Sequence, residues 1–152
     1  MQSSHINPFL QSATMVLEQM CAIRPSRGEL ALKQLQFYKE SVWLKISVTG
    51  NLQGDILFGF EQSVALKIVS GMMGGFEVTE LDEMGQSALS ELGNMISGNA
   101  SILLYNEGIA IDISPPSIIG DEDSKHLSTA KVLTIPLYLE GIGQFDMCVA
   151  LL

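Results

Sequence analysis

Residues 87–100, SALSELGNMISGNA, lie in the middle of the longest helix that the sequence predicts. Four polar or small residues share one stripe of this helix, within roughly 60° at about 100° per residue: Ser87, Glu91, Asn94 and Gly98. A carboxylate and a carboxamide therefore stand side by side, flanked by a hydroxyl and a glycine. Such a stripe is either a solvated polar face or an active surface, and the residues alone leave both interpretations open.

An apolar stripe runs beside the polar one and predicts the side of the helix that faces a core. Its members are Leu81, Met84, Ala88, Leu92, Met95 and Ala100. The helix also contains Gly85, Gly93 and Gly98, and a glycine inside a helix costs roughly 0.5–1 kcal/mol relative to alanine. Close packing explains such glycines in general. Gly98 shares the polar stripe, where a bare backbone would let a partner approach.

The composition is that of a single folded domain spanning residues 1–152. Hydrophobic residues make up 47% of the chain and the mean hydropathy is +0.29, values that exclude a disordered chain. No apolar run approaches the ~20 residues needed to cross a bilayer. The N-terminal MQSSHINPFL has neither the basic nor the apolar region of a signal peptide. We expect a soluble, cytoplasmic protein without membrane insertion.

The net charge of −9 is unevenly distributed, which excludes several kinds of function. Between Lys67 and Lys125 there is no lysine or arginine, whereas ten carboxylates occur in that interval. A nucleic-acid interface needs cations for the phosphates, so we expect no nucleic-acid partner. For the same reason the chain cannot hold a phosphoryl group alone. Phosphate chemistry would need a metal ion and a lysine from a partner.

The cysteines and histidines do not indicate metal or nucleophilic chemistry. Cys21 and Cys148 each lie among apolar residues, which predicts core packing rather than a disulfide. His5 and His126 are the only histidines, and no carboxylate–histidine spacing indicates a metal site. The sequence therefore predicts no metal of its own, and a small-molecule or metal enzyme is the weakest hypothesis.

The hydrophobic pattern predicts an α+β domain in which two long helices and a shorter one pack with an antiparallel sheet. The expected helices span residues 8–20, 61–73 and 80–105, and the expected strands span residues 29–38, 42–49, 56–60, 109–113, 132–139 and 145–151. Asn7 before Pro8 is expected to cap the first helix. Thr79 with Asp82 is similar to a capping box for the long one. Residues 120–128 are expected to form a charged loop.

The two expected hairpins share a layout. Ile46 precedes Gly54 by eight residues, and Ile135 precedes Gly143 by eight residues. Each hairpin also follows a helix and a strand-like segment, which favours two diverged helix–strand–hairpin halves in one sheet. A common hairpin length without duplication explains the spacing as well, so this internal repeat stays one of two interpretations.

The polar stripe also resembles a motif of a known family. Ser87-x3-Glu91-x2-Asn94 is similar to the Asp/Ser-x3-Glu-x2-Asn pattern of the bacterial CheC/CheX/FliY phosphatases. In that family a proline follows at a slightly greater distance than Pro115 and Pro116 do here. The opening INPFLQSATMVLEQM and the order of elements are also similar, so the resemblance covers nearly the whole chain.

The first expected helix lacks the motif, because Cys21 stands three residues after Glu18, where the pattern has asparagine. A single site is the arrangement of the CheX branch. The resemblance implies a CheC-like domain that forms a homodimer through its sheets. The apolar final strand, FDMCVALL, supports this expectation only loosely, as a strand that needs a cover.

The resemblance implies a protein phosphatase that removes the phosphoryl group from the aspartyl phosphate of a CheY-type response regulator. Glu91 would dock the active-site lysine of the regulator, and Asn94 would hold the attacking water in line. Ser87 would orient Glu91, and Gly98 would give the partner clearance. The lysine and the Mg²⁺ ion belong to the regulator, so no cofactor of the chain's own is expected.

The competing hypothesis is a non-catalytic module of the same fold that docks a receiver domain or another signalling protein. It predicts affinity without faster loss of the phosphoryl group. The sequence leaves open which response regulator is the substrate, and whether the output is motility or another signal.

Overall fold

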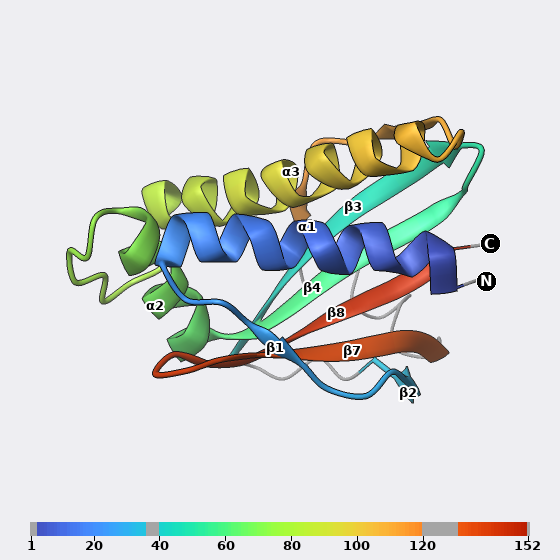
Figure 1. Cartoon of the computed structure of the whole chain (residues 1–152). Coiled ribbons are helices and arrows are strands. Elements are labelled where there is room, and N and C mark those ends of the chain that lie inside the picture. Colours follow the sequence, from blue (N-terminus) through green and yellow to red (C-terminus); the bar gives the residue numbers. More distant parts are fainter. Residues whose placement is uncertain (1–2, 36–39, 120–130, 152) are drawn as a thin grey trace.

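Three helices lie on one face of an antiparallel sheet in the computed structural model, which describes residues 3–35, 40–119 and 131–151 (Figure 1). The helices are α1 Ser3–Cys21, α2 Gln62–Met72 and α3 Glu83–Asn106. The strands are β1 Ser26–Arg27, β2 Ala31–Gln34, β3 Ser41–Gly50, β4 Gly54–Glu61, β5 Ile111–Ile113, β6 Ser117–Ile118, β7 Lys131–Leu139 and β8 Gly143–Leu151. The α+β architecture expected from the sequence is confirmed.

The sheet is built from two long hairpins that lie side by side. The β3–β4 hairpin and the β7–β8 hairpin join through β4 and β8, which gives the order β1-β7-β8-β4-β3-β5. β2 also pairs with β7, and β6 also pairs with β3. The final strand therefore lies at the centre of the sheet with both edges paired. The sequence argument that this strand needs a cover from a second protomer is wrong.

Each half of the chain adds two short strands to the hairpin of the other half. α1 is followed by β1 and β2, which add to the second hairpin, and α3 is followed by β5 and β6, which add to the first. Gly54 pairs with Val48, six positions earlier, whereas Gly143 pairs with Leu139, four positions earlier. The two hairpins therefore have the same spacing from isoleucine to glycine in the sequence but differ in how their strands are paired. The order of the elements, rather than the spacing, favours duplicated halves.

The main core fills the space between the helices and the sheet. Alternate residues of the central strands point to the helices and are fully buried, as with Leu44, Ile56 and Met147. The opposite alternation places a smaller apolar cluster on the far face of the sheet. Its members are Leu35, Trp43, Leu57, Val132 and Cys148.

α1 begins at Ser3, before the start expected at Pro8. The helix continues through the proline because Ile6 is buried in the main core in line with Phe9. Packing of this extra turn outweighs the backbone hydrogen bond that the proline cannot donate. The expected cap at Asn7 is therefore wrong, whereas the expected apolar side of the helix is confirmed.

α3 begins at Glu83, and its cap is Asp82 rather than Thr79. The Asp82 carboxylate accepts a hydrogen bond from the backbone N–H of Gly85 at 2.8 Å, which satisfies one of the free donors of the first turn. The capping box expected from Thr79 is wrong, because an aspartate nearer the helix supplies the acceptor.

The buried side of α3 differs in part from the apolar stripe expected from the sequence. Leu92 and Ala100 are buried as predicted, but Met84 is exposed and Leu81 lies before the helix. The true stripe repeats every three or four residues from Gly85. It comprises Gly85, Leu89, Leu92, Gly93, Ile96, Ser97, Ala100 and Leu104.

The remaining expectations hold to different degrees. α2 and the strands of both hairpins lie where the pattern predicted them, whereas β2 is shorter than the strand expected at residues 29–38, part of which lies outside the described residues. β1 and β6 were not predicted, because two-residue strands depend on their partners. The charged loop at 120–128 lies outside the described residues. No described helix has the length and hydropathy to cross a membrane.

Candidate active site on the central helix

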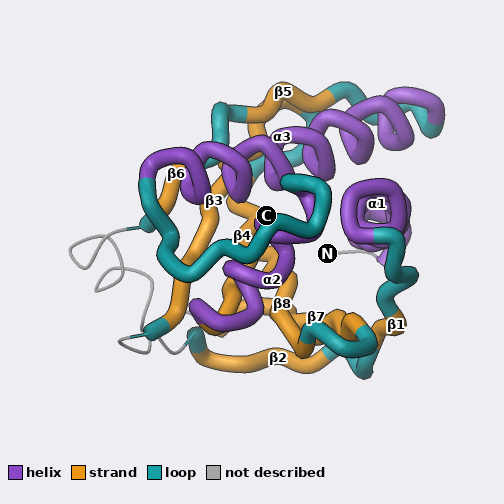
Figure 2. The backbone as a smooth tube through the Cα atoms, turned by 90° about the vertical axis from the view of Figure 1, so that its left-hand side faces the viewer, coloured by secondary structure: helices purple, strands orange, loops and turns teal. Residues whose placement is uncertain are grey.

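α3 holds the polar stripe rigidly at the surface. Its buried stripe packs over β3, β5 and β6, and α1 lies antiparallel beside it (Figures 1 and 2). Ser87, Glu91 and Asn94 are exposed on the opposite side of the helix, and Gly98 is half-buried in line with them. The structure thus places the four predicted site residues on one face, as the periodicity indicated.

The polar stripe forms one wall of an open groove of about 830 Å³. The other wall is the turn at Pro115 and Pro116 between β5 and β6. The groove is lined by Glu83, Gln86, Ser87, Ser90, Glu91, Asn94, Ile113, Pro115, Pro116 and Ile118. The sequence analysis missed five of them. The periodicity of the helix could have predicted Glu83, Gln86 and Ser90. Ile113 and Ile118 reach the groove only through the tertiary fold, which no local pattern predicts.

The proline turn is fixed to β3 by backbone hydrogen bonds on both of its sides. The backbone N–H of Ser47 donates to Ser114 Oγ at 2.8 Å, and the N–H of Ser114 donates to the Ser47 carbonyl at 2.9 Å. After the turn, the N–H of Ile119 donates to the Trp43 carbonyl at 2.9 Å. The prolines have no N–H to donate, so the pairing is interrupted between these anchors and the turn stands out beside α3.

Gly93 lies where α3 meets the proline turn and β3. A Cβ atom at this position would lie 3.4 Å from Leu44 Cδ1 and 3.6 Å from Pro116 Cβ. These are ordinary van der Waals distances, so α3 packs against both β3 and the proline turn at this position, and the contacts do not demand a glycine. Gly98 is different, since a Cβ atom there would meet nothing within 4 Å. Contacts among the described residues do not explain why position 98 is a glycine.

The polar side chains of the site are free to bind a partner. No hydrogen bond or ion pair within the described part of the chain reaches the side chains of Ser87, Glu91 or Asn94. Ser87, which was expected to orient Glu91, therefore makes no hydrogen bond to it in this structure. The Asn94 carboxamide offers both donors and an acceptor, and the Glu91 carboxylate offers acceptors only.

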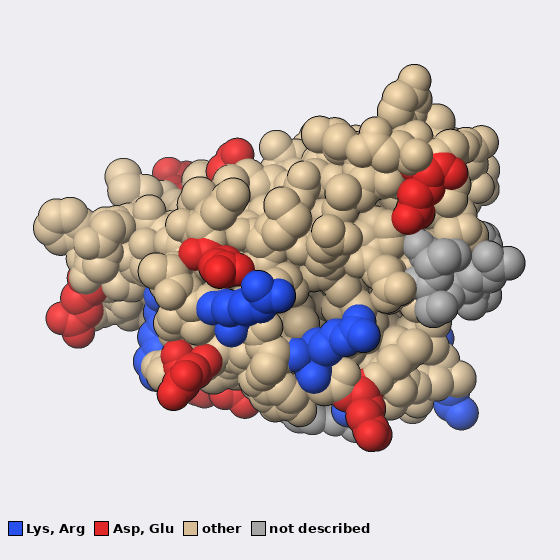
Figure 3. Space-filling view, viewed as in Figure 1, with Lys and Arg blue, Asp and Glu red and all other residues tan. Residues whose placement is uncertain are grey.

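The electrostatic surroundings of the site are one-sided. α3 carries the carboxylates Glu83 and Glu91 and contains no lysine or arginine. In Figure 3 the lysine and arginine side chains lie on the lower half of the molecule. The upper edge, over α3, is mostly uncharged, and the charged side chains seen there are carboxylates. This surface favours a partner that brings a cation to Glu91.

On α1, Glu18 and Cys21 have the same spacing as Glu91 and Asn94 on α3, but their surroundings differ. Glu18 forms an exposed ion pair with Arg24 at 3.8 Å. Cys21 Sγ lies 3.8 Å from the Ile68 carbonyl oxygen as a hydrogen-bond donor, and burial raises the pKa of this thiol. α1 therefore lacks the free carboxylate and carboxamide of α3 at this position.

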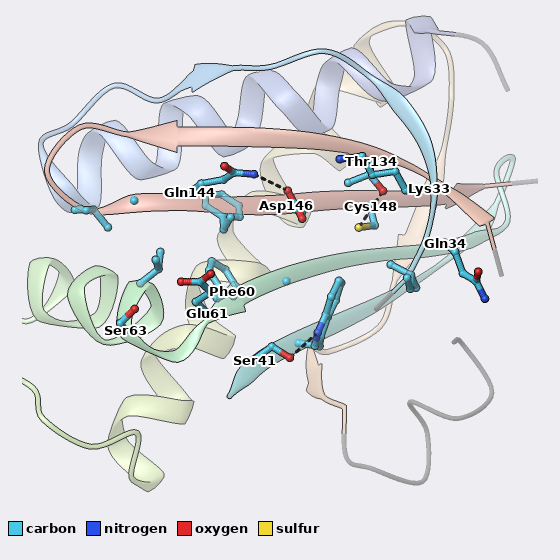
Figure 4. Close-up of a pocket in the computed structure, with 17 residues that line it drawn as sticks. Lys33, Gln34, Ser41, Phe60, Glu61, Ser63, Thr134, Gln144, Asp146 and Cys148 are labelled. Carbon is cyan, nitrogen blue, oxygen red and sulfur yellow. Dashed lines mark hydrogen bonds between the residues drawn. The ribbon is translucent and has the colours of Figure 1, made fainter. Parts of the chain in front are cut away.

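A second hollow, of about 680 Å³, lies on the far face of the sheet (Figure 4). Lys33, Thr134 and Cys148 lie together at one end of it, away from Glu61 at the other. Burial raises the pKa of the Cys148 thiol to about 12, so this sulfur stays protonated and is a poor nucleophile. The side chains described here include no cluster of histidine, cysteine or carboxylate groups that would hold a metal ion.

Comparisons with known proteins identify the family to which this fold belongs. The family model described as Chemotaxis phosphatase CheX matches residues 42–138. The CheY-P phosphatase CheX of Thermotoga maritima is 31% identical over 147 residues, covering 97% of this chain and 95% of the relative. A CheX crystal structure from Desulfovibrio desulfuricans is 25% identical with a TM-score of 0.81, over 98% of this chain and 99% of that one.

A further structural relative carries its partner. The CheX–CheY–BeF3–Mg²⁺ complex from Borrelia burgdorferi contains a chain that is 27% identical, with a TM-score of 0.80 and coverage of 97% of both chains. The three-helix fold and the exposed glutamate–asparagine pair define a CheC-like protein. Within that class, this chain belongs to the chemotaxis phosphatase CheX family.

Proposed function

We propose that this chain accelerates hydrolysis of the aspartyl phosphate on a CheY-type response regulator. The observation that carries the proposal is the unpaired Glu91–Asn94 pair on the exposed face of α3, without a cation on the same helix. The relative in Thermotoga maritima is named for the same activity. The groove is one half of an active site, and the phosphorylated regulator supplies the other half.

Asn94 holds the attacking water in this mechanism. Its neutral carboxamide can donate to and accept from one water molecule without repelling the phosphoryl oxygens. Phosphoryl transfer depends mainly on alignment and charge stabilisation, so a positioned water is a sufficient contribution from the phosphatase. A residue that only positions water needs no shifted pKa and no covalent intermediate.

Glu91 fixes the position of α3 along the surface of the regulator. One turn along the helix from Asn94, its carboxylate binds the lysine in the regulator's pocket. The charge of the phosphoryl group is stabilised by that lysine and by Mg²⁺, both of which the regulator holds. The Borrelia burgdorferi complex contains Mg²⁺ and BeF3 together with CheY, which supports placing the metal ion with the partner.

The proposed function is tested with phosphorylated receiver domains from the same organism. We expect a substoichiometric amount of this chain, with Mg²⁺ present, to accelerate release of inorganic phosphate over many turnovers. Binding to a receiver without faster release would favour the non-catalytic module. No faster release and no binding to any receiver of that organism would contradict both functions. We infer a cytoplasmic location from this class of substrate.

Gly98 gives the partner clearance beside the water-binding residue. The space above it is empty of the chain's own atoms, so Gly98→Ala removes a helix-weakening glycine and is expected to raise the free energy of unfolding by up to about 1 kcal/mol. Gly98→Leu is expected to slow phosphate release at least tenfold without loss of stability. Thermal unfolding and steady-state kinetics measure the two effects separately. Unchanged kinetics in the leucine variant would show that no partner backbone comes close.

We further propose that two protomers associate through their sheets. The support is the resemblance to the family, because the apolar cluster on the far face of the sheet, with Trp43 and Leu57 among its members, is already buried within one chain. Light scattering coupled to gel filtration is expected to give twice the 16.5 kDa mass of one chain. A mass of 16.5 kDa at micromolar concentration would exclude the dimer.

A further inference from the structure

Three large apolar side chains stand exposed on the same stripe of α3 as the glutamate–asparagine pair. Met84, Ile102 and Tyr105 are 68%, 61% and 71% exposed. They are three of the eight large hydrophobic residues that are exposed in the described part of the chain. Isolated exposed apolar residues are common on protein surfaces. Three in line with a candidate active pair indicate an interaction surface.

Helix geometry places these side chains on both sides of the pair. At about 100° per residue, Met84, Ile102 and Tyr105 fall within roughly 80° of one another and of Glu91 and Asn94. At a rise of 1.5 Å per residue, Met84 lies about 15 Å from Asn94 along the axis. Ile102 and Tyr105 lie about 12 Å and about 16 Å away in the other direction. The pair thus stands at the centre of the helix between two apolar ends.

The fold leaves this stripe without a cover among the described elements. α3 forms the upper edge of the molecule in Figure 1, with α1 on one side and the sheet below it. Gly98, between the pair and Ile102, adds no side chain to fill the surface. Tyrosine and methionine are enriched in protein interfaces, where a few anchor residues carry most of the affinity.

We propose that Met84, Ile102 and Tyr105 are the docking contacts for the receiver domain of the phosphorylated response regulator. They determine its KM and the choice among regulators, whereas Glu91 and Asn94 determine the chemical step. The inference rests on the proposed function. It assigns to these three residues a role that the catalytic pair does not require.

Size and charge select the receiver domain as the occupant. A phosphoryl group that reaches Asn94 centres its own domain on the middle of α3. A small domain about 30 Å across then extends about 15 Å each way along the axis, which is where the three apolar side chains lie. The carboxylates of α3, without a neighbouring cation, match a surface that carries a lysine at its centre. The polar pair and its apolar flanks therefore form one continuous interface.

The test is the double variant Ile102→Ser/Tyr105→Ala. We expect its KM for the phosphorylated receiver to rise about tenfold or more, with kcat within twofold of the wild type, because the catalytic pair is unchanged. The matched control is Leu32→Ser/Tyr138→Ala, which removes two side chains that are 62% and 42% exposed on β2 and β7. Its KM is expected to stay that of the wild type.

Direct binding separates failure of this inference from failure of the proposed function. Affinity for the receiver saturated with BeF3 and Mg²⁺ is expected to fall as KM rises, whether or not the wild type hydrolyses phosphate. Equal affinity of the double variant and the wild type would overturn the docking assignment. So would a loss of dimer mass with no change in affinity, since the stripe would then bind a second copy. If the double variant unfolds, Tyr105→Ser alone decides by the same measurements.

Discussion

Asn94→Ala is expected to reduce the acceleration of phosphate release on the order of 100-fold, the largest effect of any single change on this surface. The alanine removes the carboxamide that holds the water in line, and loss of alignment in a positioned reaction costs about this factor. The regulator keeps its own lysine and Mg²⁺, so its slow intrinsic hydrolysis remains. The loss should therefore be seen in kcat rather than in KM.

The Asn94→Ala variant should fold as well as the wild type. Asn94 is exposed, its side chain makes no hydrogen bond within the described chain, and alanine has the higher helix propensity. The matched control is Asn7→Ala, because Asn7 is also an exposed asparagine inside a helix but lies on α1. Wild-type kinetics are expected for that control. Equal loss in both variants would indicate a general effect of surface asparagine rather than a positioned water.

Glu91→Lys is expected to have the second largest effect, through binding. The substitution places a cation where the regulator's lysine should dock, so attraction becomes repulsion in the centre of the interface. Removing one partner of a desolvated charge pair costs about 2–5 kcal/mol, and reversing its sign costs more. We expect KM to rise at least 30-fold, with no measurable binding to the receiver that carries BeF3 and Mg²⁺.

Salt dependence and a charge-matched control identify the cause of that loss. Glu29→Lys makes the same change in net charge at an exposed position outside α3 and is expected to leave KM unchanged. Glu91→Gln keeps the shape of the side chain and should have a smaller effect that fades as ionic strength rises. If Glu91→Lys binds the receiver as the wild type does, Glu91 does not dock a lysine.

The placement of the candidate site residues on one face was predictable because it depends on one helix. The phase of Ser87, Glu91 and Asn94 follows from 3.6 residues per turn, and it holds wherever the helix begins. The start itself was mispredicted, because a cap depends on which acceptor reaches the first free N–H, and Asp82 lies nearer than Thr79. Met84 was mispredicted for another reason: the expected apolar stripe was centred on the wrong side of the helix, and at about 100° per residue Met84 lies roughly 120° from Ile96 of the buried stripe.

The parts that could not be predicted depend on contacts between distant segments. The α1 turn before Pro8 forms because Ile6 finds a place in the core. The groove needs the proline turn, which Ser114 fixes to β3 over a long sequence separation. Alternation within each strand predicted the hairpins. The pairing of the two hairpins through β4 and β8 joins segments far apart in the sequence, so no local pattern predicts it.

The most direct test of the half-site mechanism measures binding and hydrolysis by Asn94→Ala on one phosphorylated receiver. The mechanism predicts that affinity for the BeF3–Mg²⁺ form stays within about twofold of the wild type while kcat falls on the order of 100-fold, since Asn94 acts on the water and not on docking. Hydrolysis at the wild-type rate would contradict the role of Asn94. A fall in affinity that matches the fall in rate would make it a docking residue instead.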